Sequence, residues 1–398
     1  MAVPKLRFKA DDGSDYPDLV EIKIGDVIKE AKRPLDMEDD EKYQLVTVKR
    51  RNEGIVSRGM FYGRDILVKN YYTVKKGDYI ISKRQVIHGA NGIVPPELDD
   101  AIVSNEYMIL TDSSTLLVNY LALYSMTKKM YHIFYISSYG VDIEKMFFNV
   151  DDWKKKKIMV PCIKEQQKVV ELFSLIDTVI EKQKETVSAW EERKKGVMQK
   201  LFSQEVRFKA DDGSEFPDWE EKKLGDVFVE RTERSKGGEA LLSVTIAQGI
   251  VRQSATDKRN IASENKSNYK VVKKNDLAYN TMRMWQGAEG VSEYDGIVSP
   301  AYTVVTALDG NNSYFFETMF KQTLMLQTFQ RYSQGLTSDT WNLKFPAFSE
   351  IKCFVPCEDE QNKIVECVHV LDDVIEKQKA TLAAWEEMKK GLLQQMFV

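Results

Sequence analysis

The sequence predicts an α+β fold in which two related α/β domains alternate with two long helices. Three observations lead to this prediction. The peptide RFKADDGS occurs at residues 7–14 and again at 207–214. Residues 160–202 match residues 355–397 and carry a helical pattern over most of their length. The segments between them mix strand-like and helix-like stretches. Because a chance recurrence of eight residues is negligible, the chain is one unit written twice.

The repeat extends through the whole chain, but its parts have diverged differently. The flanking parts are nearly identical, whereas the middle parts, about 28–157 and 228–352, keep a skeleton and have changed most side chains. This predicts two modules that do the same job on different targets. The chain ends where a third copy would begin, so we expect its two ends to lie near each other. The further matched stretches are 74–93 with 272–291 at an offset of 198, and 100–107 with 295–302 at an offset of 195.

Each middle part contains candidate strands followed by a candidate helix. The helices are expected over Ser114–Phe134 and Tyr314–Tyr332, each followed by a turn glycine, Gly140 or Gly335. Strands are expected where β-branched and aromatic residues gather. These stretches are KYQLVTV (42–48), DYIIS (78–82), AIVSNEYMIL (101–110), LLSVTIAQGIV (241–251), NDLAYNTM (275–282) and GIVSPAYTVVTAL (296–308).

A long helix is expected after each middle part. Apolar or amphipathic side chains in 164–202, including Ile176, Val179 and Val187, recur mostly every three, four or seven positions, and 359–397 repeats the pattern. A helix of about forty residues is roughly 60 Å long. If the copies are related by a pseudo-twofold axis, the two helices run antiparallel as a coiled-coil spacer. The alternative is that each helix packs on its own domain.

These elements divide the chain into four parts. The first domain is expected over 1–157, the central helix over 158–203, the second domain over 204–352 and the C-terminal helix over 353–398. The predicted fold is therefore two pseudo-twofold-related α/β domains separated by an antiparallel coiled coil.

The composition is that of an ordinary globular protein. The 398 residues include 43% hydrophobic and 30% charged residues and carry a net charge of −4, which argues against coating nucleic acid by charge alone. This net charge does not exclude a protein that reads nucleic acid through local basic patches. We expect no secretory signal and no membrane span, because no stretch of eighteen apolar residues occurs. Four cysteines without a disulfide framework fit the cytoplasm.

Signatures of catalysis and of cofactor binding are missing from the sequence. It contains no GxxxxGK[ST], GxGxxG or GxSxG pattern and no Asn/Asp-Pro-Pro-aromatic tetrapeptide of amino-methyltransferases. The three histidines have no ligand spacing, and no metal site is expected. Asp18 and Glu21 resemble part of a nuclease motif, but they are too close in sequence and are expected in a solvated turn.

Basic and polar residues in the middle parts are the candidate DNA contacts. Arginine reads guanine and asparagine or glutamine reads adenine through paired hydrogen bonds, while lysine mostly contacts phosphate. A solvated charged face is the plainer explanation for each residue taken singly. The candidates are Lys49, Arg50, Arg51, Arg58, Arg84, Gln85 and His88 in the first domain, and Gln248, Arg252, Lys258, Arg259, Asn280, Arg283, Trp285 and Gln286 in the second.

The sequence resembles the specificity subunits of type I restriction–modification systems over essentially its whole length. The motifs that carry the resemblance are FPDWEEKKLGDV (216–227), NDLAYNTMRMWQGAEG with DGIVSPAY (275–302), the helix starts VPC-x₂-EQ (160–166, 355–361) and the helix ends KKG-x₂-Q-x₂-F (194–202, 389–397). One departure is Leu19, where the second copy has Trp219.

The resemblance implies a non-catalytic, DNA-reading subunit. Each target-recognition domain would read one half of an asymmetric, split DNA sequence on double-stranded DNA. The helices would set the spacer and dock two methyltransferase subunits, and restriction subunits would join the complex. No cofactor is expected on this chain, since S-adenosylmethionine, ATP and magnesium would lie on the partner subunits.

Two other classes of function stay open at this point. A structural adaptor would carry two protein-binding modules on a coiled coil, although such symmetry favours similar modules rather than modules that have diverged. A stand-alone nuclease or methyltransferase is disfavoured because the motifs are absent.

Overall fold

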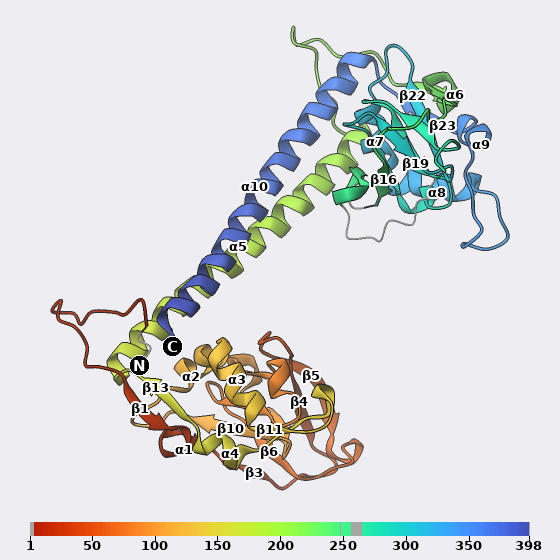
Figure 1. The fold of residues 1–398 in the computed structure, drawn as a ribbon. Coiled ribbons are helices and arrows are strands. Elements are labelled where there is room, and N and C mark those ends of the chain that lie inside the picture. The colour runs from red at the N-terminus through yellow and green to blue at the C-terminus, as the bar shows by residue number, and fades with distance from the viewer. Residues whose placement is uncertain (1–3, 247, 256–264, 398) are drawn as a thin grey trace. The chain divides into compact units, whose positions relative to one another are not determined.

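The computed structural model describes residues 4–246, 248–255 and 265–397, and these form two compact units. Unit 1 comprises Met1–Glu185 and Lys379–Val398, and unit 2 comprises Thr186–Gln378. Each unit therefore contains a globular module together with segments of both long helices (Figure 1). The four domain boundaries expected from the sequence stay a prediction.

Unit 1 is built on two sheets that contribute to one shared cluster of buried residues, with Val46 and Ile55 from one sheet and Ile80 and Ile109 from the other. A four-stranded sheet has the order β2-β10-β7-β8, and a five-stranded sheet has the order β3-β6-β9-β4-β5. Two further pairs are β1-β13 and β11-β12. The elements are β1 (Val20–Lys23), α1 (Ile24–Val27), β2 (Lys29–Glu30), β3 (Pro34–Leu35), β4 (Lys42–Val48), β5 (Ile55–Tyr62), β6 (Tyr71–Thr73), β7 (Tyr79–Ser82), β8 (Asn91–Ile93), β9 (Ile102–Ser104), β10 (Tyr107–Thr111), α2 (Val118–Ser125), α3 (Lys128–Ile136), β11 (Ser138–Tyr139), β12 (Phe147–Phe148), α4 (Val150–Lys155) and β13 (Lys157–Val160).

Unit 2 repeats this arrangement strand for strand around its central sheet. The order β15-β22-β19-β20 corresponds to β2-β10-β7-β8 of unit 1, and β14-β23 corresponds to β1-β13. The elements are β14 (Glu220–Lys223), α6 (Leu224–Val227), β15 (Phe228–Glu230), β16 (Leu242–Thr245), β17 (Gly249–Arg252), β18 (Lys270–Val272), β19 (Leu277–Asn280), β20 (Glu289–Val291), β21 (Gly296–Val298), β22 (Tyr302–Ala307), α7 (Ser313–Phe320), α8 (Thr323–Tyr332), α9 (Phe345–Ser349) and β23 (Lys352–Val355).

The expected module helices are each split in two. The predicted helix over Ser114–Phe134 is α2 followed by α3, and the one over Tyr314–Tyr332 is α7 followed by α8. In unit 1 the break lies before Lys128, because the Thr127 side chain accepts a hydrogen bond from the Met130 amide and starts a new helix. All the expected stretches contain strands, although several strands are shorter. Three stretches expected as single strands each form two: 101–110 forms β9 and β10, 241–251 forms β16 and β17, and 296–308 forms β21 and β22.

The long helices are confirmed as α5 (Ile163–Phe202) and α10 (Glu358–Met396). The early part of α5 packs antiparallel against the end of α10 in unit 1, where Asp177 pairs with Lys389 at 2.5 Å. In unit 2 the late part of α5 packs against the start of α10, where Lys194 pairs with Asp372 at 2.5 Å. The predicted face is shifted slightly, because Val179 is 37% exposed.

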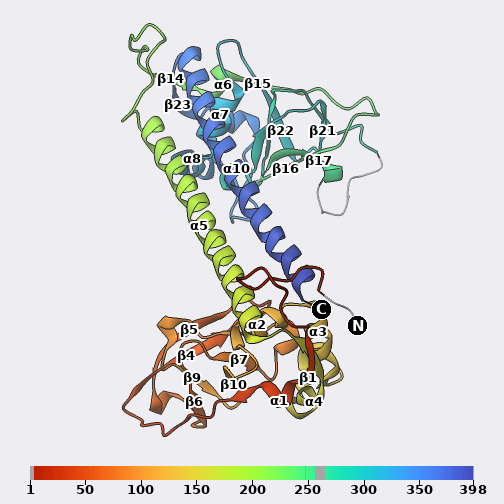
Figure 2. The same ribbon diagram turned by 90° about the vertical axis from the view of Figure 1, so that its left-hand side faces the viewer.

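The chain ends meet within unit 1, as the cyclic repeat predicts. The Leu6 amide donates to the Gln395 carbonyl at 3.1 Å, and the equivalent Val206 amide donates to Lys200 at 3.3 Å in unit 2. Phe397 is buried in the core of unit 1. Both views show the last turn of α10 beside this module (Figure 2).

In each unit, the arginine of the repeated RFKADDGS peptide forms an ion pair with the buried glutamate of the VPC-x₂-EQ motif. Arg7 donates from Nε and Nη2 to Glu165 at 3.1 and 2.6 Å, and Arg207 donates to Glu360 at 3.1 and 2.7 Å. Trp219 adds a third donor to Glu360 at 3.1 Å, where the first copy has leucine. The near identity of these segments therefore has a structural cause, since charge-assisted paired hydrogen bonds demand this geometry.

No helix in the described part of the chain combines the length and apolar character needed to cross a membrane.

Candidate nucleic-acid interface

In unit 1, the tip of the β4–β5 hairpin lies against a tight turn that follows β7. We call the turn, Gln85–Gly89, turn A. The Arg51 amide donates to the His88 carbonyl at 2.6 Å, and the Asn52 amide donates to the Gly89 carbonyl at 2.9 Å. Arg51 and Asn52 adopt left-handed backbone conformations with φ of +60° and +57°. These contacts bring the predicted residues Lys49, Arg50 and Arg51 next to Gln85 and His88.

An acidic residue from a neighbouring loop faces this cluster. The Glu144 carboxylate accepts a hydrogen bond from Arg50 at 2.8 Å and lies 3.5 Å from Nε2 of His88. Both partners of the Arg50–Glu144 pair are about half exposed, at 50% and 52%. We call the residues Lys49–Asn52, Gln85–His88 and Glu144 surface A. Its net charge is lower than the sequence prediction implied, because Glu144 neutralises one of the predicted cations.

Two other predicted residues of the first domain lie outside the contacts that build surface A. Arg84 forms a paired ion pair with Glu106 at 2.7 and 3.3 Å, and its guanidinium lies over the Phe147 ring. Arg58 is the unpaired residue of a bulge in β5, and its side chain is exposed. A bulge turns a side chain out of the regular alternation of a strand.

Unit 2 builds the equivalent surface from its own hairpin and turn. We call Arg283–Gly287 turn B, and we call Gln248–Arg252, Arg283–Gln286 and Trp341 surface B. The strands meet at two glycines, since a Cβ added to Gly290 would lie 2.8 Å from the Gly249 Cα. The equivalent Gly92 of unit 1 has Gly54 at 3.3 Å. Close backbone approach therefore holds each hairpin against the strand that follows its turn.

The side chains of surface B differ from those of surface A. Trp285 donates from Nε1 to the Met282 carbonyl at 3.2 Å and packs edge-on against Trp341 at 5.1 Å. Arg252 lies over the Tyr294 ring at 4.9 Å. Gln248 and Gln286 are exposed.

The remaining predicted residues of the second domain have other settings. The Asn280 side chain accepts a hydrogen bond from the Met282 amide at 3.0 Å, which orders the start of the turn rather than leaving the side chain free. Lys258 and Arg259 lie outside the residues that the structure describes.

A buried carboxyl group lies behind surface B that the sequence analysis did not single out. Glu289 is fully buried, and neither of its carboxylate oxygens has a hydrogen-bond partner within the described part of the chain. Burial raises its pKa well above the ordinary range. Lys321 lies 3.9 Å away, and the equivalent residue in unit 1 is Asn91, a neutral amide.

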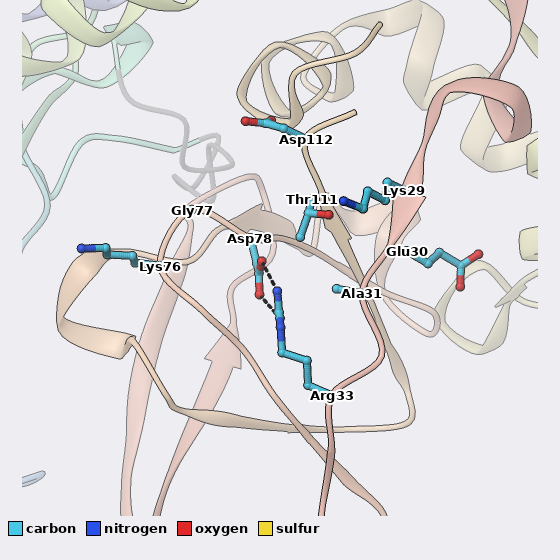
Figure 3. A pocket seen from close by; sticks show the side chains of 9 residues that line it. All are labelled: Lys29, Glu30, Ala31, Arg33, Lys76, Gly77, Asp78, Thr111 and Asp112. Atoms are coloured by element: carbon cyan, nitrogen blue, oxygen red, sulfur yellow. Dashed lines mark hydrogen bonds and ion pairs between the residues drawn. The ribbon is translucent and has the colours of Figure 1, made fainter. Parts of the chain in front are cut away.

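A hollow in unit 1 is lined mainly by charged and polar residues of the scaffold (Figure 3). Arg33 and Asp78 form a paired ion pair across it at 2.6 and 3.1 Å. Arg231 and Asp276 repeat this pair in unit 2 at 2.6 and 3.0 Å. Asp78 also accepts a hydrogen bond from the Lys75 amide at 2.7 Å, so the pair braces the turn before β7. Among the described residues, no three His, Cys, Asp or Glu side chains gather as metal ligands would.

Comparison with known proteins identifies the family. The model for the type I restriction modification DNA specificity domain matches residues 17–188 and again residues 217–384. Both matches include one module and part of a long helix.

Solved structures share the fold at low sequence identity. The HsdS subunit from Thermoanaerobacter tengcongensis is 15% identical, with a TM-score of 0.52 over 96% of this chain and 97% of that one. The type I restriction–modification S subunit from M. genitalium is 14% identical, with a TM-score of 0.56 over 100% and 99%. A chain from a study of complex assembly and conformational transition of the type I R-M system is 16% identical, with a TM-score of 0.57 over 96% and 98%. The chain therefore belongs to the type I restriction–modification DNA specificity family and is a DNA sequence-recognition subunit with two specificity domains.

Proposed function

We propose that surface A and surface B each bind one half of an asymmetric, bipartite sequence in double-stranded DNA. The observation that carries this proposal is that one hairpin-and-turn framework occurs twice with different side chains. Turn A offers glutamine and histidine, whereas turn B offers arginine, tryptophan and glutamine. A shared backbone with different hydrogen-bonding groups supports readers of the same kind with different base preferences.

Footprinting of the assembled complex on its DNA tests this division. A variant with Lys49, Arg50 and Arg51 changed to alanine is expected to lose protection over one half-site and keep it over the other. A matched variant with Lys5, Lys9 and Lys23 changed to alanine removes three cations of the same unit outside surface A. Equal loss over both halves would contradict the proposal. Absence of DNA binding by the complex would favour the adaptor function instead.

We further propose that the chain docks two methyltransferase subunits, one on each unit. The support is a second surface that is nearly the same in both units. Lys168 pairs with Asp11 and Lys363 pairs with Asp211, each at 2.5 Å. Leu175 of α5 and its equivalent Val370 of α10 are 61% and 57% exposed. Two copies of one surface fit two copies of one partner.

Native mass spectrometry of the purified complex tests the stoichiometry. Val370→Glu places a charge on the apolar face of α10 and is expected to leave one methyltransferase subunit bound, as is Leu175→Glu on α5. The double variant is expected to bind none. Two bound subunits in the double variant would place the docking surface elsewhere.

The chemistry of methylation and cleavage is proposed to reside on the partners. The absence of cofactor motifs in this sequence supports a non-catalytic role, with S-adenosylmethionine, ATP and magnesium on the methyltransferase and restriction subunits. Equilibrium dialysis with S-adenosylmethionine is expected to detect binding to the complex and none to the isolated chain.

The long helices are proposed to set the spacer between the half-sites. Removing one heptad from both helices shortens each by about 10 Å, or about three base pairs of B-DNA. The permitted spacing should shorten or be lost. An unchanged spacing preference would contradict this role.

A further inference from the structure

Turn A and turn B have the same backbone. Gln85 has φ −128° and ψ 11°, and Arg283 has φ −130° and ψ 11°. Each turn closes on a left-handed glycine, Gly89 with φ 72° and Gly287 with φ 79°. The side chains of Gln85 and Arg283 therefore start from equivalent backbone positions in the two turns.

The hydrogen bonds of the turns also correspond one to one. Residue 88 donates to the Gln85 carbonyl at 3.0 Å, and residue 286 donates to the Arg283 carbonyl at 3.0 Å. The Ala90 amide also donates to the Gln85 carbonyl at 3.1 Å, and the Ala288 amide donates to the Arg283 carbonyl at 3.2 Å. The Gly89 amide donates to the Val86 carbonyl at 2.8 Å, and the Gly287 amide donates to the Met284 carbonyl at 2.9 Å. An exchange of the two side chains would thus meet a matching backbone in either module.

The other side chains of the turns are engaged or differ in setting. Val86, Ile87 and Met284 are buried in the cores. His88 faces Glu144, as described above, whereas the equivalent Gln286 is exposed. This leaves residues 85 and 283 as the pair that has equal geometry and unequal chemistry.

Both side chains have unused hydrogen-bonding capacity. Among the described residues, the Arg283 guanidinium has no hydrogen-bond or ion-pair partner. The Oε1 atom of Gln85 is buried, and no residue that the structure describes hydrogen-bonds to it. An unsatisfied buried polar atom costs free energy, and a hydrogen bond from a ligand would offset this cost.

We propose that residues 85 and 283 are equivalent specificity-determining positions, at which Gln85 selects an A·T pair and Arg283 selects a G·C pair. Arginine makes two hydrogen bonds to O6 and N7 of guanine, and glutamine makes two to N6 and N7 of adenine. The assignment rests on the proposed function of surfaces A and B, and adds to it the residue and the base in each half-site.

Methylation sequencing of DNA treated with the assembled complex tests the assignment. The wild-type motif is determined first, and then the motifs of Arg283→Gln, Gln85→Arg and the double exchange. Arg283→Gln is expected to change one G·C pair to A·T in the second half-site and to leave the first half-site unchanged. Gln85→Arg is expected to make the converse change in the first. Preference at the affected base pair should shift by about 5- to 150-fold.

The assignment of Arg283 can also be tested on the wild-type complex by changing the DNA, so that the result does not depend on the folding of a variant. Replacement of the guanine at that pair by 7-deazaguanine removes N7, and binding is expected to weaken several-fold there and not at guanines of the spacer. Lys236→Ala serves as the control variant because its side chain is exposed in the same unit and lies outside surface B.

The outcomes distinguish a failure of the proposed function from a failure of the base assignment at residue 283. A wild-type complex without sequence preference would overturn the proposed function. A normal bipartite motif that stays unchanged in Arg283→Gln, or activity that falls equally on all sequences, would overturn only the assignment of this residue. A second half-site that contains no G·C pair would likewise overturn only the assignment of Arg283.

Discussion

Neutralising Glu144 should tighten DNA binding by the complex. Glu144 is the acidic residue of surface A, and it holds Arg50 at 2.8 Å. A DNA phosphate bound by Arg50 would have to displace this carboxylate or lie beside it. Glu144→Gln keeps the size of the side chain, removes the negative charge and releases Arg50 for phosphate.

The size of the effect follows from the exposure of the pair. With both side chains about half exposed, the Arg50–Glu144 pair contributes about 0–1 kcal/mol to stability, so the variant should fold normally. Two like charges 4 Å apart repel by about 1 kcal/mol in bulk water and more near a protein surface. Removing the repulsion between Glu144 and phosphate should therefore strengthen binding by about 1–2 kcal/mol, or about 5- to 30-fold.

Fluorescence anisotropy with a DNA duplex that carries the motif measures the affinity at several salt concentrations. The freed Arg50 should add one phosphate contact, so the slope of log K against log salt should steepen by about 1. The matched control is Glu21→Gln, which breaks an exposed pair with Lys157 of 48% and 55% exposure outside surface A. Unchanged or weaker binding by Glu144→Gln, with an unchanged slope, would refute the position of DNA on surface A.

Three further predictions concern the framework beneath the surfaces. Glu289→Gln should raise the stability of unit 2 at neutral pH, and it should remove a loss of stability that begins as pH rises above about 4.3, because the folded pKa of this buried carboxyl is raised; pH-dependent denaturation measures both. Arg207→Met should lower the free energy of unfolding, measured in urea, by about 3–5 kcal/mol, since it leaves the buried Glu360 carboxylate without its charged partner. A loss below about 1 kcal/mol would show that this ion pair does not hold the two segments together. Gly290→Ala should cost about 1–3 kcal/mol by separating two strands, whereas Gly196→Ala, with open space around it, should not destabilise α5.

The architecture could be predicted largely from the internal repeat. Long helices with sustained periodicity are the elements that a sequence specifies most directly. Helices α5 and α10 begin within a residue of the periodic stretches 164–202 and 359–397, but five residues after the expected segment starts at 158 and 353, because strands β13 and β23 come first. The breaks between α2 and α3 and between α7 and α8 were not predicted, because each junction is only two residues long, 126–127 and 321–322, and helical segments follow directly. A single cap at Thr127 is a weaker signal than the surrounding pattern.

The candidate site could be predicted only in part. In unit 1 the hairpin tip lies against turn A through backbone hydrogen bonds of Arg51 and Asn52, whereas in unit 2 the hairpin approaches β20 at Gly249 and Gly290. The sequence suggested the basic residues of the hairpins and the polar residues of the turns. It did not indicate Glu144, which lies 94 residues from Arg50, because a long-range ion pair leaves no local pattern. The equivalence of Gln85 and Arg283 was present in the alignment of the two copies, but its meaning depends on backbone angles.

A module duplication tests the central claim most directly. Residues 228–352 are replaced by a second copy of residues 28–157, and the methylation motif of the resulting complex is determined by sequencing. If each module reads its own half-site, the two halves should become identical and inverted, as the symmetry of the repeat requires. An asymmetric motif identical to that of the wild-type complex would contradict the account.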